Sequence, residues 1–75
     1  MEEIKEKLIN MLQELVGEDA EISEDLGFFD MGISSLLITT FCIRIQEEFE
    51  IECDESVIFN YSNIEELAGY ISKQN

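Results

Sequence analysis

The 75-residue sequence has no histidine, and its only cysteines are Cys42 and Cys53. A nucleophilic serine needs a nearby base, usually histidine, so this absence disfavours serine-based catalysis. The two cysteines show neither a Cys-x-x-Cys spacing nor a histidine partner, so no metal site is predicted. We therefore predict that the chain is not an enzyme.

Proline is also absent and only four glycines occur, a composition that favours helices. No signal peptide or membrane-spanning run follows the Met1-Glu2-Glu3 start, so we expect a cytoplasmic protein. The lack of a linker at either end favours a free-standing protein, and a domain excised from a longer chain is the alternative. A chain of this length forms one domain, residues 1–75, with a core too small to enclose a deep active site. Such a domain acts through its surface or through an attached group.

Basic residues are scarce, since four Lys and Arg face eighteen Asp and Glu and the net charge is −14. Binding to nucleic acid needs a basic patch, so nucleic acid is excluded as a partner, and the same repulsion argues against membranes. Basic protein surfaces are the expected partners, because opposite charge steers the encounter. We expect the chain itself to be a monomer.

The spacing of apolar residues predicts an all-α four-helix bundle, with three main helices and one short one, near residues 2–16, 35–50, 54–60 and 63–72. Gly17 is predicted to end the first helix, and Asp54 to cap the third. Ser62 and Glu65 match a capping box at the start of the fourth helix.

A long loop, residues 18–33, joins the first two predicted helices. Its apolar residues follow no clear period, and we expect them to be buried in the core: Ile22, Leu26, Phe28 and Phe29. A loop of this length in so small a domain is usually functional.

The second predicted helix has more apolar residues than one face can hold. One stripe is predicted to be core: Ile38, Phe41, Cys42, Ile45 and Phe49. Others lie on neighbouring faces and cannot all be buried with that stripe: Leu36, Leu37, Thr40 and Ile43. Exposed apolar residues on a small domain indicate a docking face. Partial burial at the helix start is an equally good interpretation for Leu36 or Leu37 alone.

Ser35 follows the turn Gly32-Ile33-Ser34 and begins this second helix. Catalysis by Ser35 is disfavoured as above, whereas capping of the helix by one of the two serines is expected. A third role is covalent attachment of a phosphate-linked group to Ser35. The free N–H groups and the positive dipole end of a helix N-terminus favour a phosphodiester, and Gly32 permits a tight turn.

Three segments carry a family resemblance: Phe28-Phe29-Asp30-Met31-Gly32, Gly32-Ile33-Ser34-Ser35-Leu36, and Phe49-Glu50-Ile51 followed by the run from Ile58 to Leu67. The chain resembles acyl and peptidyl carrier proteins, in which the serine of a Gly-x-Asp-Ser-Leu pattern holds 4′-phosphopantetheine. The resemblance covers nearly the whole chain and is weakest over the first helix. Ser34 stands where the family usually has aspartate, and Glu50 stands where many relatives have a helix-ending glycine.

The resemblance implies that a phosphopantetheinyl transferase moves 4′-phosphopantetheine from coenzyme A to Ser35. The terminal thiol of this arm then holds an intermediate as a thioester for partner enzymes such as a ketosynthase or an acyltransferase. The implied docking surface comprises Ser34, Leu36, Leu37, Thr40, Ile43 and Glu47. Serine in place of aspartate at position 34 removes a charge that partner enzymes contact.

The pathway is interpreted from the same segments. The Phe-Phe-Asp loop and the Phe-Asn-Tyr segment resemble polyketide carriers more than fatty acid carriers, so a polyketide carrier is the first interpretation. A peptidyl or aminoacyl carrier of a nonribosomal system is the second, and an unmodified carrier-like adaptor is the third. Loading of Ser35 separates the adaptor from the carriers, and the accepted cargo separates the carriers from each other.

Overall fold

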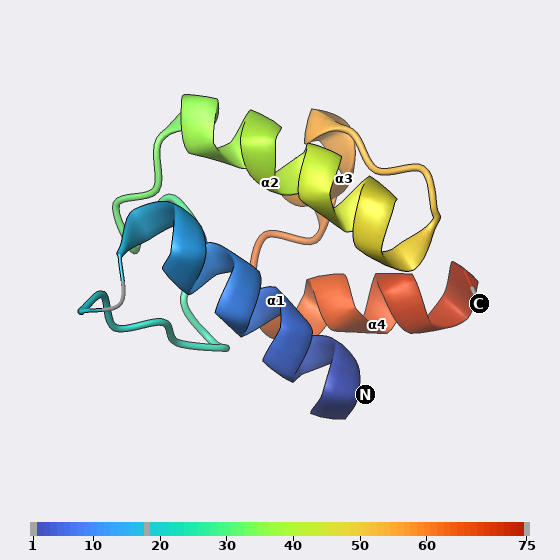
Figure 1. Cartoon of the computed structure of the whole chain (residues 1–75), viewed down its shortest axis with the longest axis horizontal. Helices are drawn as coiled ribbons and strands as arrows, with labels where there is room; N and C mark the ends of the chain where they lie inside the picture. Colours follow the sequence, from blue (N-terminus) through green and yellow to red (C-terminus); the bar gives the residue numbers. More distant parts are fainter. Residues whose placement is uncertain (1, 18, 75) are drawn as a thin grey trace.

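The structure, a computed structural model, describes residues 2–17 and 19–74, and this part of the chain forms four helices with no strand (Figure 1). The helices are α1 (Glu2–Val16), α2 (Ser35–Phe49), α3 (Glu55–Asn60) and α4 (Ile64–Gln74). Helix α1 packs against both α2 and α4, and the short α3 packs against α2. The predicted all-α, four-helix fold is therefore confirmed.

One hydrophobic core joins the helices to the long loop. Its largest fully buried side chains come from all of these elements: Leu8, Leu12, Phe28, Ile38, Phe41, Ile45, Ile58, Ile64, Leu67 and Ile71. The rings of Phe28 and Phe41 meet edge to face with their centroids 5.6 Å apart, which anchors the loop against α2. Burial of each such side chain contributes about 1.5–3 kcal/mol relative to exposure.

The predicted core stripe of α2 is confirmed over most of its length. Four of its residues are buried: Ile38, Phe41, Cys42 and Ile45. Phe49 at the end of the helix is only half-buried, and the ammonium group of Lys7 lies 5.8 Å from the centroid of its ring. Phe49 therefore packs at the edge of the core and also faces α1 through a cation–π contact.

Two helices end in left-handed residues. Gly17 has φ +111°, and its N–H donates to the carbonyl of Gln13 at 2.8 Å, so the predicted end of α1 is confirmed. Glu50 has φ 54° and ψ 46° at the end of α2. A residue with a Cβ is strained there by about 1–2 kcal/mol, whereas glycine adopts this conformation without such strain.

The observed capping residues of the last two helices lie within one residue of those predicted from the sequence. The Asp54 carboxylate accepts a hydrogen bond from the N–H of Val57 at 3.2 Å, which confirms the predicted cap of α3. At α4 the prediction of Ser62 is wrong, because the side chain of Asn63 accepts from the N–H of Glu66 at 2.8 Å. The carbonyl of Ser62 instead accepts from the loop, so α4 begins one residue later than predicted and continues to Gln74.

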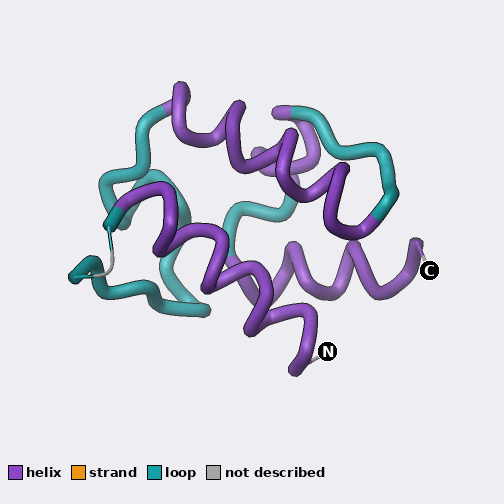
Figure 2. Tube along the Cα trace, viewed as in Figure 1, coloured by secondary structure: helices purple, strands orange, loops and turns teal. Residues whose placement is uncertain are grey.

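The long loop connects α1 to α2 (Figure 2, where loops are teal), and backbone hydrogen bonds hold it at the start of α4. The N–H of Phe28 donates to the carbonyl of Ser62 at 2.9 Å, and the N–H of Glu65 donates to the carbonyl of Glu24 at 3.3 Å. These bonds satisfy backbone groups that the loop would otherwise leave unpaired. The loop is thus packed against the bundle and fixed to it by hydrogen bonds.

The apolar residues of this loop divide between the core and the surface. Phe28 is fully buried and Ile22 is half-buried, as predicted, but Leu26 is 51% exposed and Phe29 is 45% exposed. The prediction that all four are buried in the core is therefore wrong. The backbone turns at residues 28–32, so Phe28 points into the bundle while the Phe29 ring stacks on Phe59 of α3 with centroids 5.6 Å apart.

Three of the four basic residues, Lys5, Lys7 and Arg44, connect α1 to its neighbours. Arg44 of α2 pairs with Glu14 of α1, and the ammonium of Lys7 lies 3.4 Å from the Glu48 carboxylate. Exposed pairs of this kind contribute about 0–1 kcal/mol each, so the core supplies most of the stability. Within residues 2–17 and 19–74, the structure contains no helix with the length and hydrophobicity needed to cross a membrane.

Candidate functional site

The chain reaches α2 through a tight turn that requires glycine. The N–H of Gly32 donates to the carbonyl of Phe29 at 3.1 Å, and the N–H of Ile33 donates to the carbonyl of Phe28 at 3.2 Å. Gly32 has φ +82°, a value that residues with a Cβ rarely adopt, and a Cβ added there would meet no atom within 4 Å. The turn therefore leaves open space beside the start of α2.

Ser34 caps α2, so the capping interpretation applies to this serine. Its hydroxyl accepts a hydrogen bond from the N–H of Leu37 at 3.3 Å, and its carbonyl accepts from the N–H of Ile38 at 3.0 Å. Ser35 is therefore the first residue of the helix, and it is exposed. The two adjacent serines thus have different environments, and the hydroxyl of Ser35 takes no part in the cap.

The start of α2 favours an anion. The first N–H groups of a helix have no acceptor within the helix, and the helix dipole places partial positive charge there. Helix α2 has no acidic residue in its own first turn, so no carboxylate of that turn opposes a negative group on Ser35. The residues of this site therefore fit a phosphate-linked group attached to Ser35.

An exposed stripe of α2 begins next to Ser35. Leu36 is 80% exposed and Ile43 is 50% exposed, and Thr40 and Glu47 are also exposed. Their separations of four, three and four residues place these side chains on one face of the helix. We call Leu36, Thr40, Ile43 and Glu47 the α2 stripe. Leu37 lies off this stripe, since it is half-buried and packs against the core.

Thr39 and Glu55 connect α2 to α3, and sequence reasoning missed both. The Thr39 hydroxyl lies 3.1 Å from the carbonyl oxygen of Ser35 and 2.7 Å from the Glu55 carboxylate. This contact sets the position of α3 beside the first turns of α2. The spacing of four residues between Ser35 and Thr39 was the signal in the sequence, but the Glu55 partner depends on the tertiary fold.

The two thiols lie in the core and are not activated as nucleophiles. Cys42 and Cys53 are both free and buried. Burial raises the pKa of Cys42, and burial together with the neighbouring Cys42 thiol raises the pKa of Cys53 from 9.0 to about 12. Because the thiolate is the nucleophilic form, neither thiol is activated at neutral pH. The predicted role of Cys42 as a small core residue is confirmed.

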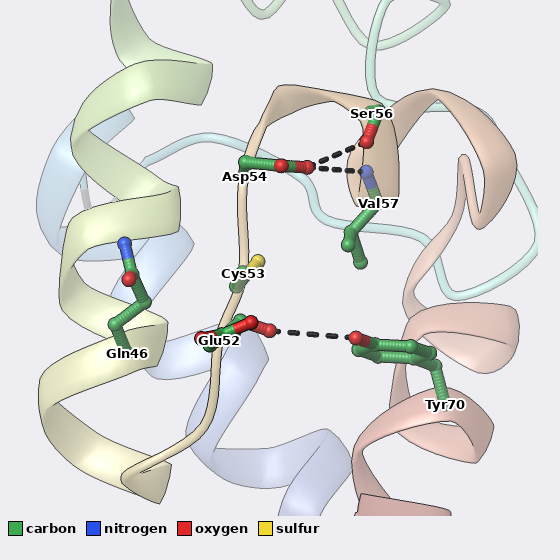
Figure 3. Close-up of a pocket in the computed structure, with 7 residues that line it drawn as sticks. All are labelled: Gln46, Glu52, Cys53, Asp54, Ser56, Val57 and Tyr70. Atoms are coloured by element: carbon green, nitrogen blue, oxygen red, sulfur yellow. Dashed lines mark hydrogen bonds between the residues drawn. The ribbon is translucent and has the colours of Figure 1, made fainter.

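A polar hollow of about 420 Å³ lies beside the link between α2 and α3 (Figure 3). Asp54 accepts hydrogen bonds from the Ser56 hydroxyl and the Val57 N–H, and the Tyr70 hydroxyl donates to the carbonyl of Glu52 at 3.4 Å. The Asp54 carboxylate thus caps α3, and the Tyr70 hydroxyl connects α4 to the link between α2 and α3. Across the residues that the structure describes, no three metal-ligating side chains gather into a candidate metal site.

The sequence matches the protein family described as "Phosphopantetheine attachment site" over residues 6–71. It is 36% identical over 66 residues to "Polyketide synthase 2" of Metarhizium guizhouense, a match that covers 87% of this chain and 3% of that protein. It is 35% identical over 69 residues to "Polyketide synthase PksN" of Bacillus subtilis, a match that covers 92% of this chain and 1% of that protein. The chain thus spans only a few per cent of the length of the curated relatives that it matches.

A solved structure has the same fold. The NMR structure of the HMG-ACPI domain from the CurA module of Lyngbya majuscula matches with a TM-score of 0.86 and 32% sequence identity, over 96% of this chain and 74% of that one. Together, the family match and the shared fold settle the relationship. The chain belongs to the phosphopantetheine-attachment family of acyl carrier domains, whose cofactor is covalently attached 4′-phosphopantetheine.

Proposed function

We propose that this chain is an acyl carrier protein of polyketide biosynthesis and that Ser35 is its attachment residue. The observation that supports this proposal most strongly is the position of Ser35, which is exposed at the start of α2 directly after the capping Ser34. On this proposal the chain catalyses no step itself. It holds biosynthetic intermediates and presents them to partner enzymes.

The attachment step is a phosphoryl-group transfer to the hydroxyl of Ser35. The oxygen of Ser35 attacks the phosphorus of coenzyme A that bears the pantetheine, the hydroxyl proton goes to a base, and 3′,5′-adenosine diphosphate leaves. The product is a phosphodiester at Ser35. The chain has no histidine, so the base for this step belongs to the phosphopantetheinyl transferase.

The residues around Ser35 hold and orient the product. The first N–H groups of α2 and its positive dipole end stabilise the phosphodiester, and Gly32 leaves the approach of the transferase open. When bound, the group supplies a flexible arm whose terminal thiol holds an acyl cargo as a thioester.

We propose that the α2 stripe, together with Ser34 and Leu37 beside the attachment residue, is the docking surface for partner enzymes. Exposed Leu36 and Ile43 supply apolar contacts, and Glu47 adds negative charge to a chain whose net charge is −14. The expected partners are the transferase, ketosynthases and acyltransferases that present basic residues around an apolar patch. We propose a monomeric, cytoplasmic carrier, consistent with the free thiols of Cys42 and Cys53.

Cargo distinguishes a polyketide carrier from a nonribosomal peptide carrier. The names of the relatives support the polyketide pathway. The protein bearing phosphopantetheine is incubated with malonyl coenzyme A and an acyltransferase, or with amino acids, ATP and adenylation enzymes, and its intact mass is measured. We expect a malonyl adduct and no aminoacyl adduct.

The other outcomes of this experiment contradict the proposal in different ways. An aminoacyl adduct without a malonyl adduct assigns the chain to a nonribosomal peptide system. Failure of Ser35 to take any phosphopantetheine, tested with several transferases, identifies an unmodified adaptor.

A further inference from the structure

Glu55 lies beside the helix that begins with the proposed attachment residue, although it belongs to α3. The Thr39 hydroxyl donates a hydrogen bond to the Glu55 carboxylate at 2.7 Å and lies 3.1 Å from the carbonyl oxygen of Ser35. One side chain thus contacts both groups. Ser35, Thr39 and Glu55 are all exposed, so a protein that reaches Ser35 also meets this carboxylate.

The start of α2 itself supplies no negative charge. Ser34 is uncharged, and α2 has no acidic residue in its first turn. Glu47 of the α2 stripe is twelve residues beyond Ser35, about 18 Å along the helix. That separation exceeds the Debye length of about 8 Å in physiological salt, so the charge of Glu47 is largely screened at Ser35. Over the part of the chain that the structure describes, Glu55 is the one carboxylate hydrogen-bonded to the first two turns of α2.

Glu55 is held in this position by contacts at both ends of α3. At the start of the helix, Asp54 is engaged as the cap (Figure 3), and the next carboxylate, that of Glu55, is bonded to Thr39. At the other end, the ring of Phe59 stacks on Phe29 of the long loop with centroids 5.6 Å apart. A group that is fixed before its partner arrives loses less conformational entropy on binding.

The segments around the start of α2 contain no positive charge. Lysine and arginine are absent from residues 8–43 and 45–72, which include the long loop, the first two turns of α2 and all of α3. Arg44 of α2 pairs with Glu14 of α1. A partner can therefore supply the cation for Glu55, because an arginine or lysine side chain forms a charge-assisted hydrogen bond with a carboxylate.

We propose that Glu55 is a recognition residue for the phosphopantetheinyl transferase and that Thr39 positions it, an inference that rests on the proposed function. A basic side chain of the transferase pairs with the Glu55 carboxylate while Ser35 enters the active site of that enzyme. Glu55 thereby supplies, from α3, the negative charge that the start of α2 lacks. The carboxylate is bonded to the second turn of α2, whereas the unpaired N–H groups lie at the helix start, so a phosphodiester on Ser35 still meets the positive end of the helix.

The test measures phosphopantetheine transfer at increasing concentrations of this protein, with saturating coenzyme A and one broad-specificity transferase. Glu55→Gln removes the charge but keeps an oxygen that can accept from Thr39. It should raise KM for the protein by roughly tenfold with kcat unchanged, the pattern produced by losing a contact that is equally strong in the bound and transition states. The difference should shrink between about 0.05 M and 0.5 M salt, because screening weakens the ion pair.

Two further variants separate this contact from a general effect of charge. Glu6→Gln removes the same charge from an exposed position near the start of α1, which lies at the opposite end of the bundle from the start of α2 (Figure 1). Its KM should equal that of the wild type. Ser34→Asp in the Glu55→Gln protein places a carboxylate directly before Ser35 and should restore most of the lost affinity.

Thr39 is tested as a positioning residue. Thr39→Val removes the hydroxyl and keeps the shape of the side chain, so Glu55 keeps its charge but loses its fixed place, and KM should rise by about threefold. Thr39→Ser keeps a hydroxyl and should behave as the wild type. Thermal melting shows whether each variant is folded. A merely structural role for Thr39 would lower the melting temperature of Thr39→Val without a change in KM.

Two results for the carboxylate would overturn the inference and leave the proposed function intact. An unchanged KM for Glu55→Gln shows that the transferase does not contact this carboxylate. An equal rise in KM for Glu6→Gln shows that the total charge of the chain, rather than Glu55, attracts the transferase. A wild-type protein that takes no phosphopantetheine contradicts the proposed function itself, and the inference about Glu55 falls with it.

Discussion

The hydroxyl of Ser34 accepts a hydrogen bond from the backbone N–H of Leu37 at 3.3 Å, and this contact separates the roles of two adjacent serines. Ser34 is engaged in the cap, and its backbone is extended with φ −78° and ψ 161°. Ser35 then starts the helix with an exposed side chain. The position of the proposed attachment site therefore depends on a cap formed by its neighbour.

The first prediction concerns this cap. Ser34→Ala removes the acceptor for Leu37 and should lower the free energy of unfolding by about 1 kcal/mol. Ser34→Asp keeps a capping oxygen and adds negative charge at the positive end of α2, so it should be at least as stable as the wild type. Urea unfolding followed by circular dichroism measures both variants. A Ser34→Ala protein with unchanged stability would contradict the assignment of Ser34 as the cap.

The second prediction concerns the α2 stripe. Leu36→Ala and Ile43→Ala should each lower kcat/KM for transfer of phosphopantetheine by roughly tenfold, the effect of losing about 1.4 kcal/mol of contact energy with the transferase. Because both side chains are exposed, the free energy of unfolding should change by less than about 0.5 kcal/mol. Loading rates and urea unfolding curves test the two statements separately.

A buried residue of the same helix serves as the control for this pair. Ile45 is fully buried, so Ile45→Ala should destabilise the protein by about 2–5 kcal/mol. If Leu36→Ala or Ile43→Ala loses a similar amount of stability, then that residue belongs to the core, and its proposed docking role is wrong.

The third prediction concerns the left-handed end of α2. Glu50 has φ 54°, so Glu50→Gly should relieve strain and stabilise the fold by about 0.5–1 kcal/mol. Glu50→Gln removes the same charge but keeps the Cβ atom. Thermal melting of the two variants distinguishes strain from charge, and equal gains in both would show that repulsion rather than backbone strain is responsible.

The fourth prediction concerns stability at alkaline pH. The pKa of the Cys53 thiol is raised from 9.0 to about 12, so in this range the unfolded chain ionises while the folded protein keeps its proton. The contribution is therefore present below about pH 9 and is lost as the pH rises toward 12. Urea unfolding between pH 8 and 11 should show this decline, and Cys53→Ala should make it shallower. An unchanged slope in the variant would assign the decline to other groups.

The sequence predicted the helices well because their apolar residues recur at helical spacing. The end of α1 and the start of α3 were also predictable, since Gly17 and Asp54 act through the local backbone alone. The start of α4 was misplaced because Ser62 and Asn63 are both good caps. The choice between them depends on the bond from Phe28 to the Ser62 carbonyl, a contact between distant segments.

The surroundings of the site were only partly predictable. The turn at Gly32 and the serines at the start of α2 follow from local sequence, so Ser35 was identified correctly as the first residue of the helix. The exposure of Phe29 was not predictable, because its ring packs on Phe59 from a helix distant in the sequence. A hollow lined by Leu15, Ile22 and Leu37 was not predictable either, since it forms only when α1, the loop and α2 come together.

The most direct test of the central claim is the intact mass of the protein after incubation with coenzyme A and a broad-specificity phosphopantetheinyl transferase. Wild type, Ser35→Ala and Ser34→Ala are compared, and circular dichroism confirms that each is folded. The account predicts one added phosphopantetheine on the wild type and on Ser34→Ala, and none on Ser35→Ala. Addition to Ser35→Ala, or no addition to the wild type with several transferases, would contradict it.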